Sequence, residues 1–148
     1  MMKSLKGKSK GMTLIEVLIA LAILGVIAVA FLAGLTTALR GVIIADEHAV
    51  AQSLAASQFE SVKNQNYTVA NNGADATYAK IDLSTYIDYD ITGVNRDGDV
   101  VNNVTGIPFN PDTGATVEQE DMGIQSVTIK VYRSSKLLLT LTDYKVYR

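Results

Sequence analysis

One acidic side chain, Glu16, lies near the start of a long apolar run. From Val17 to Leu39 the sequence has no Asp, Glu, Lys or Arg, and a threonine pair, Thr36 and Thr37, supplies the side-chain hydroxyls. A carboxylate inside a bilayer costs roughly 2.5–3.5 kcal/mol on insertion scales. Because such a charge must be neutralised or used, its position predicts a functional residue.

Side chains suited to catalysis are scarce. The sequence has no cysteine, and its one histidine, His48, is expected on a helix surface. Three serines on the same helix have no nearby partner base: Ser53, Ser57 and Ser61. Four acids are considered as oxygen ligands for Ca²⁺: Asp88, Asp90, Asp97 and Asp99. The segment 95–99 lacks the full EF-hand spacing and contains a cation, so an ordinary acidic turn is favoured. We expect no enzyme activity, no cofactor and no metal site.

A basic leader precedes the apolar run. It contains Lys3, Lys6, Lys8 and Lys10 and no acid, whereas only Arg40 follows the run closely. The 23 residues from Val17 to Leu39 exceed the roughly 20 that a membrane-spanning helix needs. The positive leader favours a cytoplasmic N-terminus. We therefore expect a single span, with the C-terminal domain outside the cytoplasm.

Two other interpretations of this run are open. A buried core helix is usually shorter and carries polar residues on one face. A secretory signal peptide is a second alternative, because Ala28-Val29-Ala30 has the small residues of a cleavage site, and a cut after Ala30 would release a secreted domain. However, Phe31 and Leu32 continue the apolar run beyond that point, which is too long for a signal peptide.

The segment from Lys10 to Ala20, KGMTLIEVLIA, resembles the prepilin-type leader and N-terminal segment of type IV pilins and type II secretion pseudopilins. The resemblance implies cleavage between Gly11 and Met12 by a membrane-embedded prepilin peptidase. The same enzyme would methylate the new N-terminus at Met12. Thr13, Glu16 and Gly25 stand where the family has a threonine, a glutamate and a membrane-helix glycine.

Three departures from the family refine the resemblance. Met12 replaces the usual phenylalanine, and Ala33 stands where many major pilins have a helix-kinking proline. The absence of cysteine excludes the C-terminal disulfide loop of many pilins. The chain is therefore most like a minor pilin or a type II secretion minor pseudopilin.

The resemblance also implies an assembly chemistry and a set of partners. Cleavage would create an amine at Met12, which Glu16 of a neighbouring subunit could neutralise. Such a contact joins two different surfaces and propagates as an open filament. Gly25 and Gly34 would allow close helix packing. Expected partners are prepilin peptidase, other pilin or pseudopilin subunits, an inner-membrane assembly platform protein and the lipid bilayer. A type IV pilus, a secretion pseudopilus and a competence filament stay open, with the filament in the periplasm or at the cell surface.

The chain is expected to have three parts: a leader (1–11), the membrane and assembly half of a long helix (12–40), and one extracytoplasmic domain (41–148). Apolar residues at helical spacing continue the helix to about residue 66, and they form one stripe: Val50, Ala51, Leu54, Ala55, Phe59 and Val62. Shorter alternating segments over 78–148 predict an antiparallel sheet covering that stripe. The expected fold is α+β and pilin-like.

Turn residues divide the sheet into three to five predicted strands. Asp97-Gly98 predicts a hairpin, and the segment 108–114 predicts a loop. Ser126–Arg133 alternates clearly, and Ser134-Ser135 turns the chain into the last strand. In that strand the apolar phase changes, which predicts a bulge near residues 142–143.

The last hairpin carries most of the basic side chains of residues 41–148, namely Lys130, Arg133, Lys136, Lys145 and Arg148. A solvated edge that discourages strand pairing is the simpler interpretation. The alternative is an anchored or tip-located binding module, an adhesin or a DNA-capturing protein, that uses this hairpin. Residues 41–148 hold 14 acids against 8 Lys and Arg, which disfavours general nucleic-acid binding.

Overall fold

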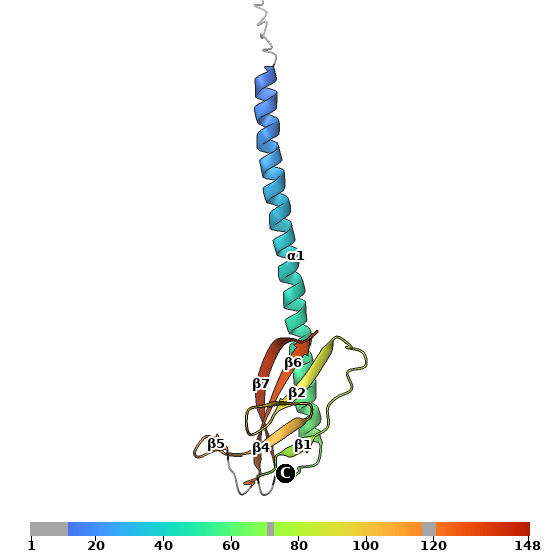
Figure 1. Cartoon of the computed structure of the whole chain (residues 1–148), viewed down its shortest axis with the longest axis vertical. Helices are drawn as coiled ribbons and strands as arrows, with labels where there is room; N and C mark the ends of the chain where they lie inside the picture. Colours follow the sequence, from blue (N-terminus) through green and yellow to red (C-terminus); the bar gives the residue numbers. More distant parts are fainter. Residues whose placement is uncertain (1–11, 71–72, 117–120) are drawn as a thin grey trace, which may run out of the picture. The chain divides into compact units, whose positions relative to one another are not determined.

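A computed structural model describes residues 12–70, 73–116 and 121–148 of this chain (Figure 1). The chain divides into two compact units, Met1–Ile43 and Ile44–Arg148. The helix α1, Leu14–Asn64, contributes to both. Seven strands follow, all in the second unit: β1 (Ala76–Tyr78), β2 (Tyr89–Val94), β3 (Val100–Val101), β4 (Val104–Asn110), β5 (Ala115–Thr116), β6 (Ile124–Arg133) and β7 (Lys136–Val146).

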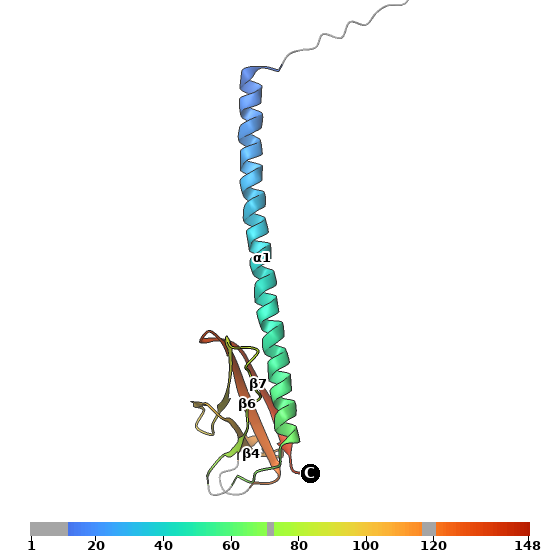
Figure 2. The ribbon, with the colours of Figure 1, turned by 90° about the vertical axis from the view of Figure 1, so that its right-hand side faces the viewer.

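The second half of α1 lies against one face of the sheet (Figure 2). Its inward positions recur at three- and four-residue spacing, which is what a helix needs to bury one stripe. The buried apolar helix residues are those of the predicted stripe: Ala51, Leu54, Ala55, Phe59 and Val62, with Val50 partly buried beside them. They pack against the inward side chains of the sheet, among them Ile91, Val127, Ile129 and Val131. The α+β architecture, a long N-terminal helix packed on an antiparallel sheet, is thus confirmed.

Strand β6 is the centre of the sheet. Strand β7 pairs with it from Arg133 back to Ile124 and occupies one edge. The other edge is shared, because β2 pairs with residues 129–133 of β6 and β4 pairs with residues 125–127. The end of β2 therefore meets the start of β4. Gly93 makes this possible, since a Cβ there would lie 2.2 Å from the main-chain oxygen of Asn103.

The sheet agrees with the predicted turn at Asp97-Gly98 but has more strands than the sequence pattern predicts. The hairpin at Asp97-Gly98 is confirmed by the β2–β3 pairing, with Gly98 at φ +87°. The prediction of three to five strands was wrong, because the described residues form seven. The additional ones have only two or three residues each, too few to show an alternating pattern. The predicted loop at 108–114 was wrong at its start, because Pro108 lies in β4 opposite Gln125. Strand β1 ends its pairing with β4 at Gly106, so the proline occupies a free edge.

The predicted bulge near residues 142–143 was wrong, because the irregularity of the last hairpin lies next to its turn. The register shifts between Val131 and Tyr132, opposite Leu138, and pairing is regular at residues 142–143. The apolar phase of β7 changes for a different reason. Asp143 and Lys145 both bond to the helix, so charged side chains take the inward positions that apolar ones take earlier in the strand.

Polar contacts tie the β6–β7 hairpin to α1 at both ends. At one end, which we call the Glu47 end, Arg133 Nη1 lies 2.6 Å from Glu47 Oε1. At the other, the Lys145 end, the Lys145 ammonium donates to main-chain oxygens in the last turn of α1 and to that of Gln65, just after it. Lys63 and Asp143 add an ion pair of 2.5 Å near that end. These contacts set the direction of the hairpin along the helix.

Candidate functional site: the start of the long helix

The start of α1 is held by a capping contact. Thr13 Oγ1 accepts a hydrogen bond from the main-chain nitrogen of Glu16 at 3.4 Å. The main-chain oxygen of Thr13 accepts from Glu16 at 3.0 Å and from Val17 at 3.2 Å. A threonine followed three residues later by glutamate is the spacing of a capping box. Our interpretation of the sequence missed this signal, although the motif contains it.

Capping places the Glu16 carboxylate in the first helical turn. The positive end of the helix dipole favours an anion at this position. Within the described residues, the carboxylate has neither a hydrogen-bond nor an ion-pair partner. The side chain of Met12, just outside the helix, is 67% exposed. The other side of the expected cleavage site, Gly11, lies outside the described residues.

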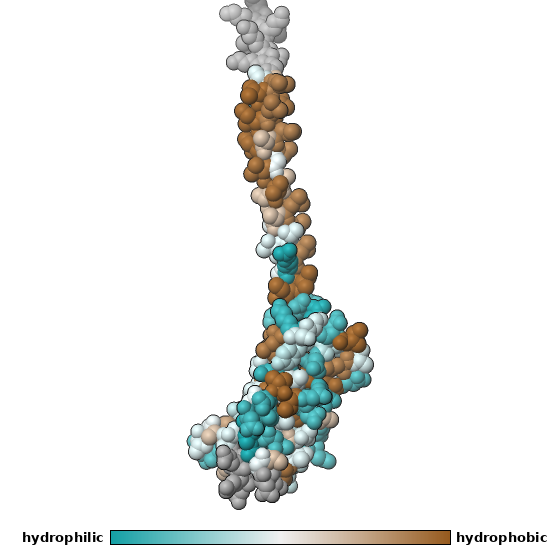
Figure 3. Space-filling view, in the orientation of Figure 1, coloured by the Kyte–Doolittle hydropathy of each residue, from teal (hydrophilic) through white to brown (hydrophobic). Residues whose placement is uncertain are grey.

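The first part of α1 presents apolar side chains on the face that Figure 3 shows, and it has no protein cover. All residues from 14 to 46 are exposed in the isolated chain. Near the N-terminus, α1 contains one stretch that is long and apolar enough to cross a membrane. No residue of this stretch is buried by the protein. Exposed apolar surface on this scale requires lipid or other helices around it. These features fit a protein anchored in the inner membrane.

Polar atoms in the apolar part of α1 are satisfied locally. The hydroxyls of Thr36 and Thr37 both donate to the main-chain oxygen of Ala33, at 2.8 and 3.0 Å. The helical hydrogen bonds satisfy the main chain. Gly25 and Gly34 are open, since a Cβ on either would meet nothing within 4 Å. Between residues 14 and 39, Glu16 is consequently the side chain whose polar group still needs a partner.

The five basic residues of the last hairpin do not form one surface. Lys145 is only 3% exposed and caps the helix, with its ammonium 5.0 Å from the ring centre of Tyr78. Arg133 is paired with Glu47 and lies over the ring of Tyr89. Lys130 lies on the sheet face opposite α1, between inward-facing Ile129 and Val131. Lys136 begins β7, and Arg148 follows its end, so a full strand separates them. The five basic residues are separated because Arg133 and Lys145 bind the helix.

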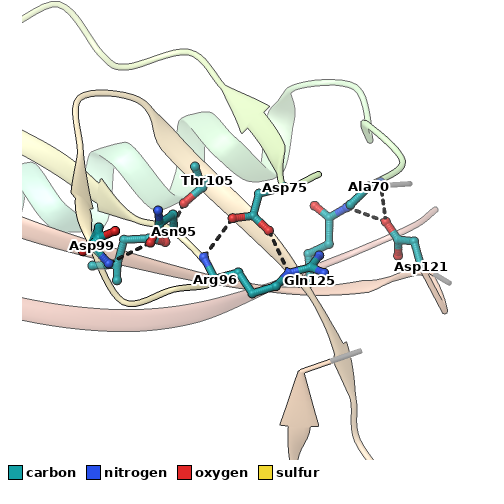
Figure 4. A network of polar contacts seen from close by, with 9 residues as sticks. Ala70, Asp75, Asn95, Arg96, Asp99, Thr105, Asp121 and Gln125 are labelled. Atoms are coloured by element: carbon teal, nitrogen blue, oxygen red, sulfur yellow. Dashed lines mark hydrogen bonds and ion pairs between the residues drawn. The ribbon is translucent and has the colours of Figure 1, made fainter. Parts of the chain in front are cut away.

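A second polar cluster surrounds Asp121 at the Lys145 end, and Figure 4 shows its contact with the main chain of Ala70. Its carboxylate accepts from the hydroxyl of Tyr67 at 2.5 Å and from the main-chain nitrogens of Ala70 and Gly123 at 3.0 and 2.9 Å. Gln125 Nε2 donates to it at 2.5 Å, while Gln125 Oε1 accepts from the hydroxyl of Tyr78 at 2.6 Å. The cluster joins the segment after α1 to the start of β6.

The Asp121 cluster changes the pKa values of its members. Burial raises the pKa of Asp121, but the hydrogen bonds, first that from Tyr67, outweigh burial and hold this pKa below its usual range. Burial and the bond to Asp121 raise the pKa of Tyr67, and burial raises that of Tyr78. Every group has a partner, so the cluster serves structure. Within the described residues no three His, Cys, Asp or Glu side chains are placed to hold a metal ion.

Comparison with known proteins identifies the N-terminal segment. Residues 6–32 match a family model described as the prokaryotic N-terminal methylation motif. This match supports a type IV pilin-like prepilin segment, which is structural and not enzymatic. It implies processing by prepilin peptidase and assembly with other pilin subunits. No curated protein and no solved structure matches this chain.

Proposed function

We propose that this chain is a structural subunit, most like a minor one, of a type IV pilus, a type II secretion pseudopilus or a competence-type filament. Cleavage between Gly11 and Met12 and methylation of Met12 would produce the mature subunit. It would be a single-pass protein of the inner membrane, with residues 41–148 outside the cytoplasm. An assembly platform protein in that membrane would add it to the filament.

The observation that carries this proposal is that the carboxylate of Glu16, at the start of an exposed apolar helix, has no partner among residues 12–70, 73–116 and 121–148. Cleavage after Gly11 would place a positive amine at Met12, one helical turn away. A neighbour's amine and this carboxylate would neutralise each other where water is absent, and removing one member of such a buried pair costs about 3–5 kcal/mol. The open surfaces at Gly25 and Gly34 would let neighbouring helices approach closely.

The processing step is tested by mass spectrometry of the N-terminal peptide from cells that contain prepilin peptidase. The expected peptide begins at Met12 and carries one added methyl group. Replacing Gly11 by a bulky residue, as in Gly11→Leu, should leave the leader attached. A peptide that begins at Phe31 would instead support secretion after Ala30, and an uncut N-terminus in the native chain would refute processing.

The assembly step is tested with Glu16→Gln, which removes the charge but keeps the shape. The matched control is Glu60→Gln, because Glu60 is an exposed carboxylate of the same helix outside the apolar segment. Membrane insertion and processing should survive in both variants. Co-purification with sheared filaments should be lost or fall sharply only for Glu16→Gln. If both variants enter filaments as well as the native chain, Glu16 has no role in assembly.

A binding module built on the basic hairpin is the other candidate from the sequence. It would need its cations on a common surface, and the burial of Lys145 and the pairing of Arg133 remove two of them. We therefore do not propose a nucleic-acid contact.

A further inference from the structure

The hydroxyl of Thr92 is buried and has no partner. Its Oγ1 makes no hydrogen bond within the part of the chain that the structure describes, and Thr92 is only 9% exposed. Ile91, before it, belongs to the core against α1, and successive residues of a strand point to opposite faces. The Thr92 side chain therefore lies on the sheet face away from α1. Because buried hydroxyls in proteins are nearly always paired, this one indicates a binding partner from outside the chain.

A hollow on the same face has Thr92 in its lining. The strands lie in front of the second half of α1 in Figure 1, so this face is toward the reader. The hollow has a volume of about 360 Å³, within the range of about 300–1,000 Å³ for small-molecule sites. Its lining includes Asp90 and Thr92 of β2, Val100 of β3, Tyr132 of β6 and the turn residues Ser134 and Ser135. All of these belong to the second compact unit.

Main-chain geometry fixes one wall of the hollow. The nitrogen of Ser134 donates to the oxygen of Asp88 at 2.9 Å, which joins the β6–β7 turn to the segment before β2. Ser134 and Ser135 have φ values of 46° and 69°, which cost free energy for residues with a side chain. Asparagine or glycine would adopt these values more easily. The chain thus carries two hydroxyls at the hollow at some cost in stability.

The polar side chains of the hollow suit a ligand with several hydroxyl groups. Asp90 Oδ2 and the carboxylate of Asp88, which also lines the hollow, only accept hydrogen bonds. Neither has a partner among the described residues. The hydroxyls of Thr92, Ser134 and Ser135 can each donate or accept. O–H groups, which both donate and accept, would satisfy this mixed set.

The charges beside the hollow balance. Asp88 and Asp90 line it, Lys80 pairs with Asp90 at 3.1 Å, and Lys130 stands opposite Thr92 in the neighbouring strand. Two acids and two cations leave no net charge to attract an ion. The arrangement therefore favours a neutral ligand.

Apolar surface completes the lining. Val100 is 47% exposed, and Tyr132, opposite Asp90, is partly exposed on the same face. A pyranose ring has C–H groups on its faces and hydroxyls around its rim. It can therefore pack on apolar and aromatic side chains while its hydroxyls bond to the few polar groups that fix its orientation. A purely apolar ligand would leave the Thr92 hydroxyl unpaired.

We propose that this hollow binds a neutral pyranose sugar, with one sugar hydroxyl bonded to Thr92 Oγ1 and the ring packed against Tyr132 and Val100. The inference goes beyond the proposed function, because it assigns a carbohydrate contact to the domain outside the apolar segment. It does not depend on filament assembly, since every residue that carries it lies within residues 44–148.

The test is a titration of the full, isotope-labelled chain, followed by nuclear magnetic resonance of its main-chain amides. The detergent is dodecylphosphocholine, whose headgroup carries no sugar that could compete. The probes are the methyl glycosides of glucose, galactose, mannose and N-acetylglucosamine, which resemble units of a glycan, and free glucose, which represents an unlinked sugar. At least one probe should give saturable shifts that gather at residues 90–92, 100 and 132–135. The expected Kd is on the order of millimolar, as for a small ligand with few contacts.

The decisive variant is Thr92→Val, which keeps the shape of the side chain but removes its hydroxyl. We expect it to weaken sugar binding by about fivefold or more, because a bound sugar hydroxyl would lose its partner. Its unfolding midpoint should equal or exceed that of the native chain, because the lost hydroxyl has no partner within the described residues. The matched control is Thr140→Val, an exposed threonine of β7 opposite Lys130 and outside the hollow, which should leave binding unchanged.

Several outcomes would overturn the inference. They are the absence of saturable shifts with every sugar, shifts spread over other faces of the domain, and unchanged binding in Thr92→Val. Binding of butylammonium in place of the sugars would assign a cation site, and equally tight binding of cyclohexanol would assign an apolar one. A marked loss of stability in Thr92→Val would show that the hydroxyl is already paired inside the folded chain. None of these results bears on the Glu16 tests, so the proposed function is judged separately.

Discussion

Replacing Lys145 by methionine tests the contact that ties the last strand to the end of α1. The ammonium is buried and donates to the main-chain oxygens of Val62, Lys63 and Gln65, the last two at 3.3 and 2.6 Å. Carbonyls in the last turn of a helix have no partner within the helix. Methionine keeps the apolar part of the side chain but offers no donor, so the oxygens of Lys63 and Gln65 would lose this bond, and that of Val62 would keep only the bond from the nitrogen of Gln65.

The expected loss of stability follows from two opposing effects. An unsatisfied buried polar group costs about 1–3 kcal/mol. The well-bonded oxygen of Gln65 loses its donor, whereas that of Val62 keeps the hydrogen bond from the main-chain nitrogen of Gln65 at 3.3 Å. Removing the ammonium also relieves the burial that lowers the pKa of Lys145, which offsets part of the loss. We expect the free energy of unfolding of the domain to fall by about 1–3 kcal/mol, or roughly 5–20 °C in melting temperature for a domain of this size.

The assay is thermal unfolding of the full chain in detergent, followed by near-ultraviolet circular dichroism of the tyrosines in residues 44–148. Hydrogen exchange at residues 62–66 reports the helix end directly and should accelerate. The matched control is Lys136→Met on the same strand, which is exposed and should change stability by no more than about 0.5 kcal/mol. If Lys145→Met unfolds within that margin of the native chain, water replaces the ammonium and our account of the cap is refuted.

Three further perturbations follow from the sheet and its polar cluster. Gly93→Ala should destabilise the domain by about 1–3 kcal/mol, because the new Cβ would lie 2.2 Å from the main-chain oxygen of Asn103. The control is Gly41→Ala, whose Cβ would meet nothing within 4 Å and should not destabilise the domain. Denaturant unfolding of both variants measures the difference. Ser134 and Ser135 have φ values of 46° and 69°, a backbone region that strains residues with a side chain. Replacing them by Asn-Gly should raise the free energy of unfolding by about 1 kcal/mol, and an unchanged unfolding midpoint would show that the turn is not strained. Asp121 and Asp143 have lowered pKa values in the folded chain, so their stabilisation is complete above an unfolded pKa of about 4 and is lost as pH falls through the folded values. Acid unfolding should accordingly be less steep in Asp121→Asn, and the same slope in both proteins would argue against a role for this carboxylate.

The candidate site could be predicted from the sequence to a large extent, because its signals are local. The spacing of Gly11, Met12, Thr13 and Glu16 is a short motif, and the apolar run needs only composition to be recognised. The helical stripe from Val50 to Val62 is likewise a periodic pattern. By contrast, whether Glu16 meets a neighbour's amine depends on a second chain.

The placement of the basic residues could not be predicted in the same way. Alternation along β7 indicates which positions share a face, but it does not indicate that the end of α1 packs against that face. Lys145 reaches carbonyls about 80 residues earlier in the chain, and Arg133 pairs with an acid 86 residues away. Charge alone therefore suggested an exposed surface where the structure has two internal ties.

What the sequence determined by itself was each element whose cause is local. These are the capped start of α1, its apolar first half, its amphipathic second half and the turns at Gly98 and Ser134-Ser135. What only the tertiary structure decided was how distant segments meet: β2 and β4 share one edge of β6 at Gly93, and Lys145 bonds to the end of the helix. The physical reason is that periodicity and turn chemistry act over a few residues, whereas pairing and burial depend on which surfaces the whole chain brings into contact.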